Sequence, residues 1–265
     1  MINKSDLQQL EVKTSKIIKE AGKFIYESWE KFDLIKSALK DKRDVVTNID
    51  VEAENMIREK LAHLLPEAGF IVEEGQNSPK EYSWVIDPID GTKYFSSHTP
   101  LFVTQLALVK GLEPILGVIY NPMSQQLFSA SLENGARLNN QILLEKTRTD
   151  PNTAILEWDG GGNFIKHPWK IPLHNALLKS FYRVRSFGAY SIYLTTGAFD
   201  AYVFLEQIKI VDIKPNIIIM KEAGLKVQTF KFNNHPVTVC SNQKLIDYIG
   251  ELIINCHCEK SRLAG

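Results

Sequence analysis

The stretch WVIDPIDGT, residues 84–92, places two aspartates at the end of a short apolar run. The apolar residues predict a buried strand, and carboxylates at the end of such a strand are costly unless they bind something. Pro88 fixes its own φ angle and Gly91 tolerates unusual backbone angles, so a tight turn can direct Asp87, Asp90 and a carbonyl oxygen toward one point. Oxygen ligands of this kind suit Mg²⁺.

A helix that begins after Gly91 would add an anion site to this cation site. Its unbonded backbone N–H groups and the positive end of its dipole would face the same point and could hold a phosphate. The alternative is an ordinary type I turn that starts at Asp87, with Asp90 as the N-cap of the helix and no bound metal.

Acidic residues in similar settings occur at three other places. Glu73 and Glu74 follow the apolar run FIV, Asp44 and Asp50 bracket the loop DVVTNID, and Asp212 ends the run IKIV just before a helical pattern. Each has a plain structural explanation: Thr47 with Asp50 matches a capping box, Asp212 matches an N-cap, and the glutamates match a solvated turn. Several acidic residues at strand ends or helix starts nevertheless indicate one shared site.

The rest of the chain alternates between helical and strand-like patterns. Apolar spacing predicts a long helix over residues 7–35 and a second helix from residue 53 to Pro66. Further helical patterns lie near residues 190–197 and 215–224. Short β-branched runs predict strands at 70–74, 84–87, 102–109, 115–120, 126–131, 154–158, 182–187 and 200–206. This alternation predicts a layered α/β architecture with mixed sheets, which we divide into residues 1–150 and 151–265.

Composition excludes several other classes of protein. With 44% hydrophobic and 23% charged residues, the 265-residue chain is neither disordered nor collagen-like. The 31 basic and 31 acidic residues cancel, so net charge gives no reason to expect binding to nucleic acid or to an anionic membrane. Three cysteines favour a reducing compartment, and the run CHC at 256–258 lacks the further ligands of a zinc site. No stretch reaches the roughly 20 apolar residues of a membrane span, and we expect a cytoplasmic protein.

On these residues the sequence resembles the inositol monophosphatase family of Mg²⁺-dependent, lithium-sensitive phosphatases. WVIDPIDGTKYF resembles the family motif W-x-[IV]-D-P-[IL]-D-G-T-x-N-F, and PLFVTQLALV, GVIYNP and NGARLN are similar to stretches that follow it. The resemblance extends over nearly the whole chain. Other family elements match Thr47 with Asp50, Glu73 with Glu74, Arg185 with Gly188, Gly197 with Asp200, and Asp212 followed by KEAG.

The resemblance implies a layered αβαβα sandwich, as in inositol monophosphatase and fructose-bisphosphatase, a homodimer, and two or three Mg²⁺ ions. Thr92 and Asp50 would orient the attacking water. Glu73 and Thr92 are our candidates to position and deprotonate it, and the backbone N–H groups of Gly91 and Thr92 to hold phosphate. Most metal ligands would lie in residues 1–150. The implied ligands are Glu73, Asp87, the carbonyl of Ile89, Asp90 and Asp212.

Substrate selection is implied for residues 151–265. Glu206 could accept hydrogen bonds from hydroxyl groups, and Tyr190 replaces a small family residue and could narrow the pocket. Arg185 and Glu206 could instead be surface ion-pair residues. The implied substrate-binding set is Arg185, Gly188, Tyr190 and Glu206.

Several positions depart from the family pattern. Tyr94 replaces Asn, Val211 replaces Trp, and Lys214 with Pro215 replaces small residues. We expect these changes to affect substrate fit or helix packing more than phosphoryl chemistry. The family's loop lysine matches either Lys40 or Lys42, in a charged loop that we expect near the site.

The sequence therefore predicts an enzyme, a Mg²⁺-dependent phosphomonoesterase that acts on inositol monophosphate or a related small polyol or sugar phosphate. DGTKYF is also similar to the branches that act on phosphoadenosine phosphate or histidinol phosphate, which gives a second prediction with the same chemistry. A third possibility is a non-catalytic regulatory or RNA-associated member of the family. The intact acidic set and the zero net charge favour the enzyme.

Overall fold

The computed structural model describes residues 2–31, 36–39, 45–160, 167–186, 191–205 and 210–263. These residues form two compact units, Met1–Leu143 with Lys209–Glu222 and Leu144–Ile208 with Ala223–Gly265. The chain therefore leaves the first unit and returns to it, and Asp212 belongs to the same unit as the acidic residues near Asp87. The division of roles between residues 1–150 and 151–265 stays a prediction.

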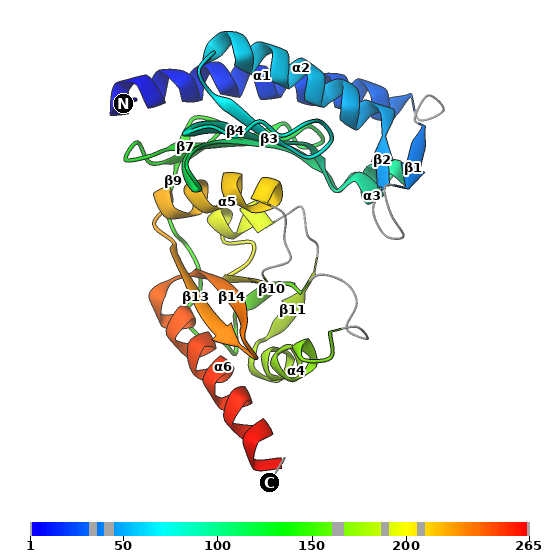
Figure 1. Cartoon of the computed structure of the whole chain (residues 1–265). Coiled ribbons are helices and arrows are strands. Elements are labelled where there is room, and N and C mark those ends of the chain that lie inside the picture. The colour runs from blue at the N-terminus through cyan, green and yellow to red at the C-terminus, as the bar shows by residue number, and fades with distance from the viewer. Residues whose placement is uncertain are drawn as a thin grey trace. The chain divides into compact units, whose positions relative to one another are not determined.

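The first unit is built on a seven-stranded sheet in which β3 and β4 are parallel and all other neighbouring strands are antiparallel. Helices α1 and α2 cover one face of this sheet, and α5 covers the other (Figure 1). A small β1–β2 pair precedes α2. The strands, in sheet order, are β3 (Gly69–Val72), β4 (Tyr82–Asp90), β5 (Val103–Lys110), β6 (Glu113–Asn121), β7 (Gln126–Ser131), β8 (Ala136–Leu138) and β9 (Gln141–Leu143), and the other elements are α1 (Lys4–Glu30), β1 (Ser37–Leu39), β2 (Val45–Thr47), α2 (Asn48–Leu64), α3 (Thr92–Ser96) and α5 (Ile210–Glu222).

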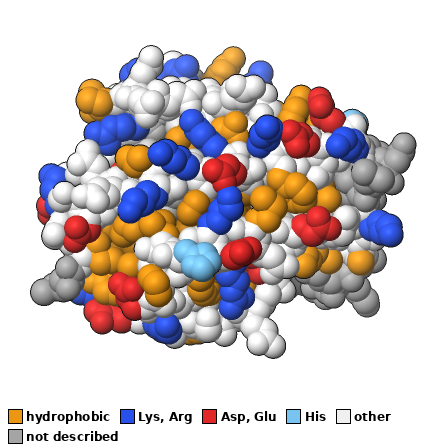
Figure 2. Space-filling model, turned by 90° about the horizontal axis from the view of Figure 1, so that it is seen from above, with side chains coloured by type: hydrophobic (Ala, Val, Ile, Leu, Met, Phe, Trp, Pro, Cys, Tyr) orange, Lys and Arg blue, Asp and Glu red, His pale blue; other side chains and the backbone are white. Residues whose placement is uncertain are grey.

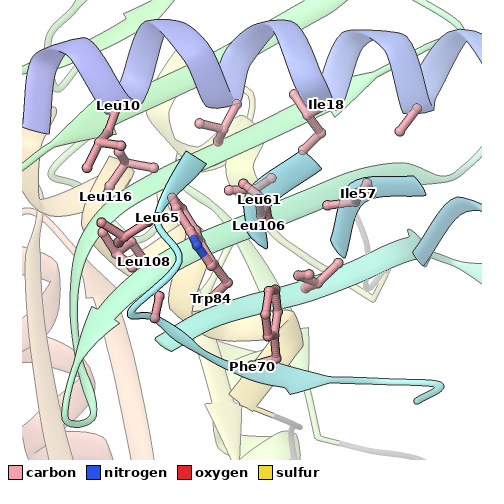
Figure 3. Close-up of a cluster of buried hydrophobic side chains, with 14 of the residues drawn as sticks. Leu10, Ile18, Ile57, Leu61, Leu65, Phe70, Trp84, Leu106, Leu108 and Leu116 are labelled. Carbon is pink, nitrogen blue, oxygen red and sulfur yellow. The ribbon is translucent and has the colours of Figure 1, made fainter. Parts of the chain in front are cut away.

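The alternation of side chains along β4 and β5 separates a dry core from the acidic residues. Trp84, Leu106 and Leu108 point toward α1 and α2, where they pack with apolar side chains of both helices (Figure 3). Val85 and Ala107 point to the opposite face and pack with Val211 of α5. Because successive strand residues alternate between faces, Asp87 and Gln105 also lie on the α5 side.

The second unit contains a five-stranded sheet in the order β11-β10-β12-β14-β13. Strand β10 is parallel to β11 and β12, and the other neighbours are antiparallel. Helices α4 and α6 pack together, and α6 also contacts β13 and β14. The elements are β10 (Ile155–Asp159), α4 (Lys170–Ser180), β11 (Arg183–Arg185), the 3₁₀ helix η2 (Ser191–Thr196), β12 (Ala201–Leu205), β13 (Lys226–Phe232), β14 (His235–Ser241) and α6 (Gln243–Leu263).

Asp200, which belongs to one of the motifs similar to those of the family, accepts several hydrogen bonds within the second unit. Its carboxylate accepts hydrogen bonds from the backbone N–H groups of Arg148 and Ile155, both at 2.7 Å, and from the Arg148 guanidinium at 2.8 Å. The side chain is buried, so these three donors compensate its charge. Asp200 therefore stabilises the packing of the second unit.

The predicted α/β class is confirmed, with some shifts of element boundaries. The first helix ends at Glu30, and part of its predicted C-terminal end lies outside the described residues. The second helix begins at Asn48, earlier than the apolar pattern indicated, because Thr47 and Asp50 form a capping box. Among the described residues, no helix combines the length and apolar character that crossing a membrane requires.

The surface covered by α1 and α2 carries charges of both signs. Figure 2 shows lysines and arginines interspersed with aspartates and glutamates over this face. The interspersed pattern agrees with the equal numbers of basic and acidic residues in the chain.

Candidate metal centre

Three carboxylates of the first unit come together on the α5 side of the sheet. Glu73, Asp87 and Asp212 each offer an oxygen, and these oxygens all lie within 4.8 Å of one another. Asp87 is only 1% exposed. Burial, followed by the charges of Glu73, Asp90 and Asp212, raises the pKa of Asp87 well above its usual range. A group of negative charges this close and this dry requires a compensating cation or bound protons.

Strand pairing explains why two of these residues meet. Strands β3 and β4 are parallel, and Val72 lies opposite Ile86. Glu73 and Asp87 each follow directly after this pair along the chain, so the two residues lie side by side. Asp212 comes from the first turn of α5, where Val211 packs against the apolar face of the sheet. Val211, which replaces a family Trp, thus anchors the helix beside the site.

Strand β4 continues through Asp90, so an irregular stretch of strand takes the place of the tight turn predicted after Asp87. The register of β4 and β5 shifts between Asp87 and Asp90. Gly91 has φ = 99°, and a Cβ atom there would lie 2.6 Å from the carbonyl oxygen of Leu101. Only glycine combines that φ angle with so close an approach. Helix α3 begins at the next residue, Thr92.

Thr92 and Asp50 contact each other, as the resemblance implied. The Thr92 hydroxyl lies 3.1 Å from Asp50 Oδ1 and 2.9 Å from the carbonyl oxygen of Ile89. Asp50 is buried, and its Oδ2 accepts hydrogen bonds from the backbone N–H and the hydroxyl of Thr47. Burial raises the pKa of Asp50 to about 6, although these donors oppose the shift. Asp50 therefore serves both the helix cap and Thr92.

Two amides that the sequence analysis did not single out connect the acidic residues. Gln105 Nε2 donates to Asp87 Oδ2 at 3.1 Å and to Asp90 Oδ2 at 3.0 Å. Asn216 Nδ2 donates to Gln105 Oε1 at 3.0 Å and to the carbonyl oxygen of Asp212 at 2.8 Å. Both amide side chains are buried. The available signal was a glutamine inside the otherwise apolar run of β5.

Glu54 of α2 is a second residue that sequence reasoning missed. Its two carboxylate oxygens accept hydrogen bonds from the backbone N–H groups of Glu74 and Gly75, each at 2.8 Å. The side chain is buried, and burial raises its pKa. Glu54 lies one helical turn after Asp50 and holds the turn that directly follows Glu73.

The remaining predicted site residues lie in the second unit or outside the described residues. Arg185 is an exposed residue at the end of β11 in the second unit. Gly188, Tyr190 and Glu206 lie outside the described residues, as do Lys40 and Lys42. Their roles stay predictions.

Comparison with known proteins identifies the family. The sequence matches the inositol monophosphatase family over residues 6–253, and the chain belongs to this family. This confirms the resemblance found in the motifs.

Individual relatives carry different names. The chain is 31% identical to the Nus factor SuhB of Pasteurella multocida over 217 residues, which covers 78% of this chain and 79% of the relative. It is 32% identical to an inositol-1-monophosphatase of Caulobacter vibrioides over 222 residues, with coverage of 76% and 84%. It is 31% identical to a fructose-1,6-bisphosphatase/inositol-1-monophosphatase of Thermotoga maritima over 219 residues, with coverage of 81% and 82%.

Solved structures confirm the fold. An extragenic suppressor protein SuhB from Bartonella henselae aligns with a TM-score of 0.81 at 22% identity, covering 90% of this chain and 95% of the other. A staphylococcal IMPase-I complexed with products aligns with a TM-score of 0.79 at 22% identity, covering 93% and 95%. The inositol monophosphatase fold predicted from the motifs is therefore present.

Proposed function

We propose that the protein is a Mg²⁺-dependent phosphomonoesterase that hydrolyses inositol monophosphate or a related small polyol or sugar phosphate. The observation that carries this proposal is the cluster of Glu73, Asp87 and Asp212, whose carboxylate oxygens lie within 4.8 Å of one another. Membership of the inositol monophosphatase family supports the same chemistry.

The residues of the cluster fit a hard divalent cation. All of its donors are oxygens, which Mg²⁺ prefers. The buried Asp87 Oδ1 has no hydrogen-bond partner among the described residues, so this oxygen has a lone pair available for a cation. The residues that would hold Mg²⁺ are Glu73, Asp87, the Ile89 carbonyl, Asp90 and Asp212.

Bound Mg²⁺ would lower the pKa of a water molecule and neutralise charge on the phosphate. The chain's own part is to position that water. The Thr92 hydroxyl has one hydrogen and two acceptors within reach, Asp50 and the Ile89 carbonyl. With the carbonyl oxygen used as a ligand, the hydrogen points to Asp50, and the lone pairs of Thr92 can accept a hydrogen bond from the water. We assign Glu73 as the second group that positions and deprotonates it.

Phosphate and alcohol recognition complete the proposal. The backbone N–H groups of Gly91 and Thr92 would hold phosphate oxygens. Arg185, Gly188, Tyr190 and Glu206 would select the alcohol, with Glu206 as an acceptor for its hydroxyl groups. The proposal also includes a cytoplasmic homodimer that Li⁺ inhibits, and sedimentation velocity of the purified protein tests its dimeric state.

The test is release of inorganic phosphate from a panel of esters with Mg²⁺, with Mg²⁺ plus Li⁺, and with EDTA. The panel contains inositol monophosphates, fructose bisphosphate, phosphoadenosine phosphate, NADP and histidinol phosphate. We expect metal-dependent, lithium-inhibited turnover that is fastest with an inositol or sugar phosphate. Faster turnover of phosphoadenosine phosphate or histidinol phosphate would keep the chemistry and replace the substrate.

A second candidate function is a regulatory or RNA-associated role without catalysis. The relatives named Nus factor SuhB favour it, because they are about as similar to this chain as the named phosphatases. A folded, Mg²⁺-binding protein that releases no phosphate from any ester would support this role. Capture of cellular RNA and protein partners would then be the next measurement.

Glu54→Gln should weaken Mg²⁺ binding by about tenfold, because a carboxylate that supports a metal-ligand segment is replaced by an amide with only one acceptor oxygen. One of the two N–H groups after Glu73 would then lose its acceptor. Titration calorimetry with Mg²⁺ measures the change. Glu52→Gln, an exposed change on the same helix, is the matched control and should bind Mg²⁺ like the wild type. Equal affinities for the two variants would contradict this role of Glu54.

A further inference from the structure

We infer that Gln105, held by Asn216, is a positioning residue that orients Asp87 and Asp90 for the metal ion. This inference rests on the Mg²⁺ site of the proposed function. One amide nitrogen contacts Oδ2 of both aspartates, at 3.1 Å and 3.0 Å. Asp87 Oδ1, the oxygen that Gln105 does not engage, has no hydrogen-bond partner among the described residues. Gln105 therefore fixes which oxygen of Asp87 faces the ion.

Strand register places Gln105 where it can reach both carboxylates. It lies directly opposite Asp87 in the antiparallel pair of β4 and β5, so both side chains are on the same face of the sheet. Because the register shifts after Asp87, the side chain of Asp90 also reaches the Gln105 amide. Two residues that are three positions apart on a regular strand would point to opposite faces, so the irregularity is needed for this double contact.

Asn216 determines which end of the Gln105 amide faces the acids. The carbonyl oxygen of Asp212 can only accept a hydrogen bond, so the Asn216 side chain must present Nδ2 to it. The same nitrogen donates to Gln105, which must then present Oε1 to Asn216 and Nε2 to the carboxylates. The backbone of α5 thereby sets the orientation of an amide on β5.

The hydrogen bonds from Gln105 to the two aspartates are strong because their acceptors are carboxylates and because the amide is buried away from water. Gln105 is 0% and Asn216 is 2% exposed. Hydrogen bonds from an amide to a carboxylate are stronger than those between neutral groups, and a low local dielectric strengthens them further. Groups that orient metal-ligating carboxylates in this way typically change metal affinity by about 10- to 100-fold when removed.

The test is Mg²⁺ titration calorimetry on the full chain after removal of metal with EDTA. We expect Gln105→Leu to weaken Mg²⁺ binding by about 10- to 100-fold, and Asn216→Ala to weaken it by about tenfold. The double variant should bind no more weakly than Gln105→Leu alone, because Asn216 acts through Gln105. In phosphate-release assays, excess Mg²⁺ should restore the kcat of Gln105→Leu while the Mg²⁺ concentration for half-maximal rate rises.

The matched control is Thr104→Val, a change of the neighbouring residue on β5. Thr104 is also fully buried, but it points to the other face of the sheet, and its hydroxyl has no hydrogen-bond partner among the described residues. Thr104→Val should bind Mg²⁺ like the wild type. Circular dichroism and thermal unfolding in EDTA establish that each variant is folded. Asn216→Ala carries the test if Gln105→Leu does not fold.

The possible failures can be told apart. If the wild type binds Mg²⁺ and Asp87→Asn does not, but folded Gln105→Leu and Asn216→Ala bind like the wild type, the positioning role is wrong and the metal site stands. If Thr104→Val weakens binding as much as Gln105→Leu, the effect is one of general packing and the inference is overturned. If the wild type does not bind Mg²⁺, the proposed metal site and this inference are both wrong.

Discussion

Asp87→Asn will release phosphate at least about 1000-fold more slowly than the wild type, since a metal-ligand charge supplies several kcal/mol of transition-state stabilisation. Asp87 is the most deeply buried member of the acidic cluster, so water cannot replace its carboxylate. Steady-state phosphate release with Mg²⁺ measures the effect on the best ester of the panel. Glu113→Gln, an exposed change on β6 of the same sheet, should keep wild-type turnover.

The same variant should be more stable than the wild type when metal is absent. Burial and neighbouring charges raise the pKa of Asp87 well above its ordinary value of 3.8. The folded, metal-free protein therefore holds a proton that the unfolded chain releases, and it loses stability as pH rises from near 3.8 through the higher folded-state pKa. Asparagine does not titrate, so the advantage of the variant grows as pH rises over that range.

Thermal unfolding across this pH range, in EDTA and in Mg²⁺, measures both effects of Asp87→Asn. The order should reverse in Mg²⁺, because only the wild type gains stability by binding the ion. A variant that is less stable than the wild type in EDTA at every pH would show that Asp87 stabilises the fold without metal. A variant with near-normal turnover would remove Asp87 from the metal site.

Thr92→Ala should lower kcat by about 100- to 1000-fold, in the range of a group that assists proton transfer to or from a reacting water. The hydroxyl would donate to Asp50, which is not among the proposed metal ligands, and would leave the Ile89 carbonyl oxygen, 2.9 Å away, to the ion, so Mg²⁺ affinity should change little. Kinetics and Mg²⁺ titration on the same preparation separate these quantities. Thr92→Ser keeps the hydroxyl and should retain most of the turnover. Weak Mg²⁺ binding with normal kcat in Thr92→Ala would place Thr92 in the binding shell instead.

The parts of the site that the sequence could predict depend on short-range signals. Asp87, Asp90 and Gly91 lie within five consecutive residues, where proline fixes one φ angle and glycine permits a positive one. Thr47 and Asp50 form a capping box, which is defined by four consecutive residues. Chemistry that is written into a few neighbouring residues can be recognised without knowing how distant elements pack.

The contacts that the sequence analysis missed depend on tertiary structure. Gln105 and Asn216 are 111 residues apart, and they meet only because α5 docks on the face of the sheet to which β5 presents its glutamine. Along the chain, Gln105 is simply a polar residue inside an apolar strand. Glu54 similarly resembles an ordinary helix glutamate in the sequence. Only the folded structure brings the backbone N–H of Glu74, which follows β3, to its carboxylate.

The sequence analysis also missed helix α6, although the sequence of this helix carries a clear local signal. Leu245, Ile246, Ile249 and Ile253 are buried and follow the spacing of an amphipathic helix. The periodic signal was therefore present in the sequence, whereas no local signal exists for the pairing of Gln105 with Asn216.

The return of the chain to the first unit has a consequence for the order of folding during synthesis. Segment Lys209–Glu222 belongs to that unit, although the strands that it covers are complete by Leu143. Until the ribosome has released this segment, the sheet exposes Val85 and Ala107 on an apolar face, next to acids that lack Asp212. Closure of the first unit must therefore wait for most of the polypeptide. A nascent chain that stops before α5 would expose an apolar face of the sheet to chaperones, and its proposed metal site would lack one ligand.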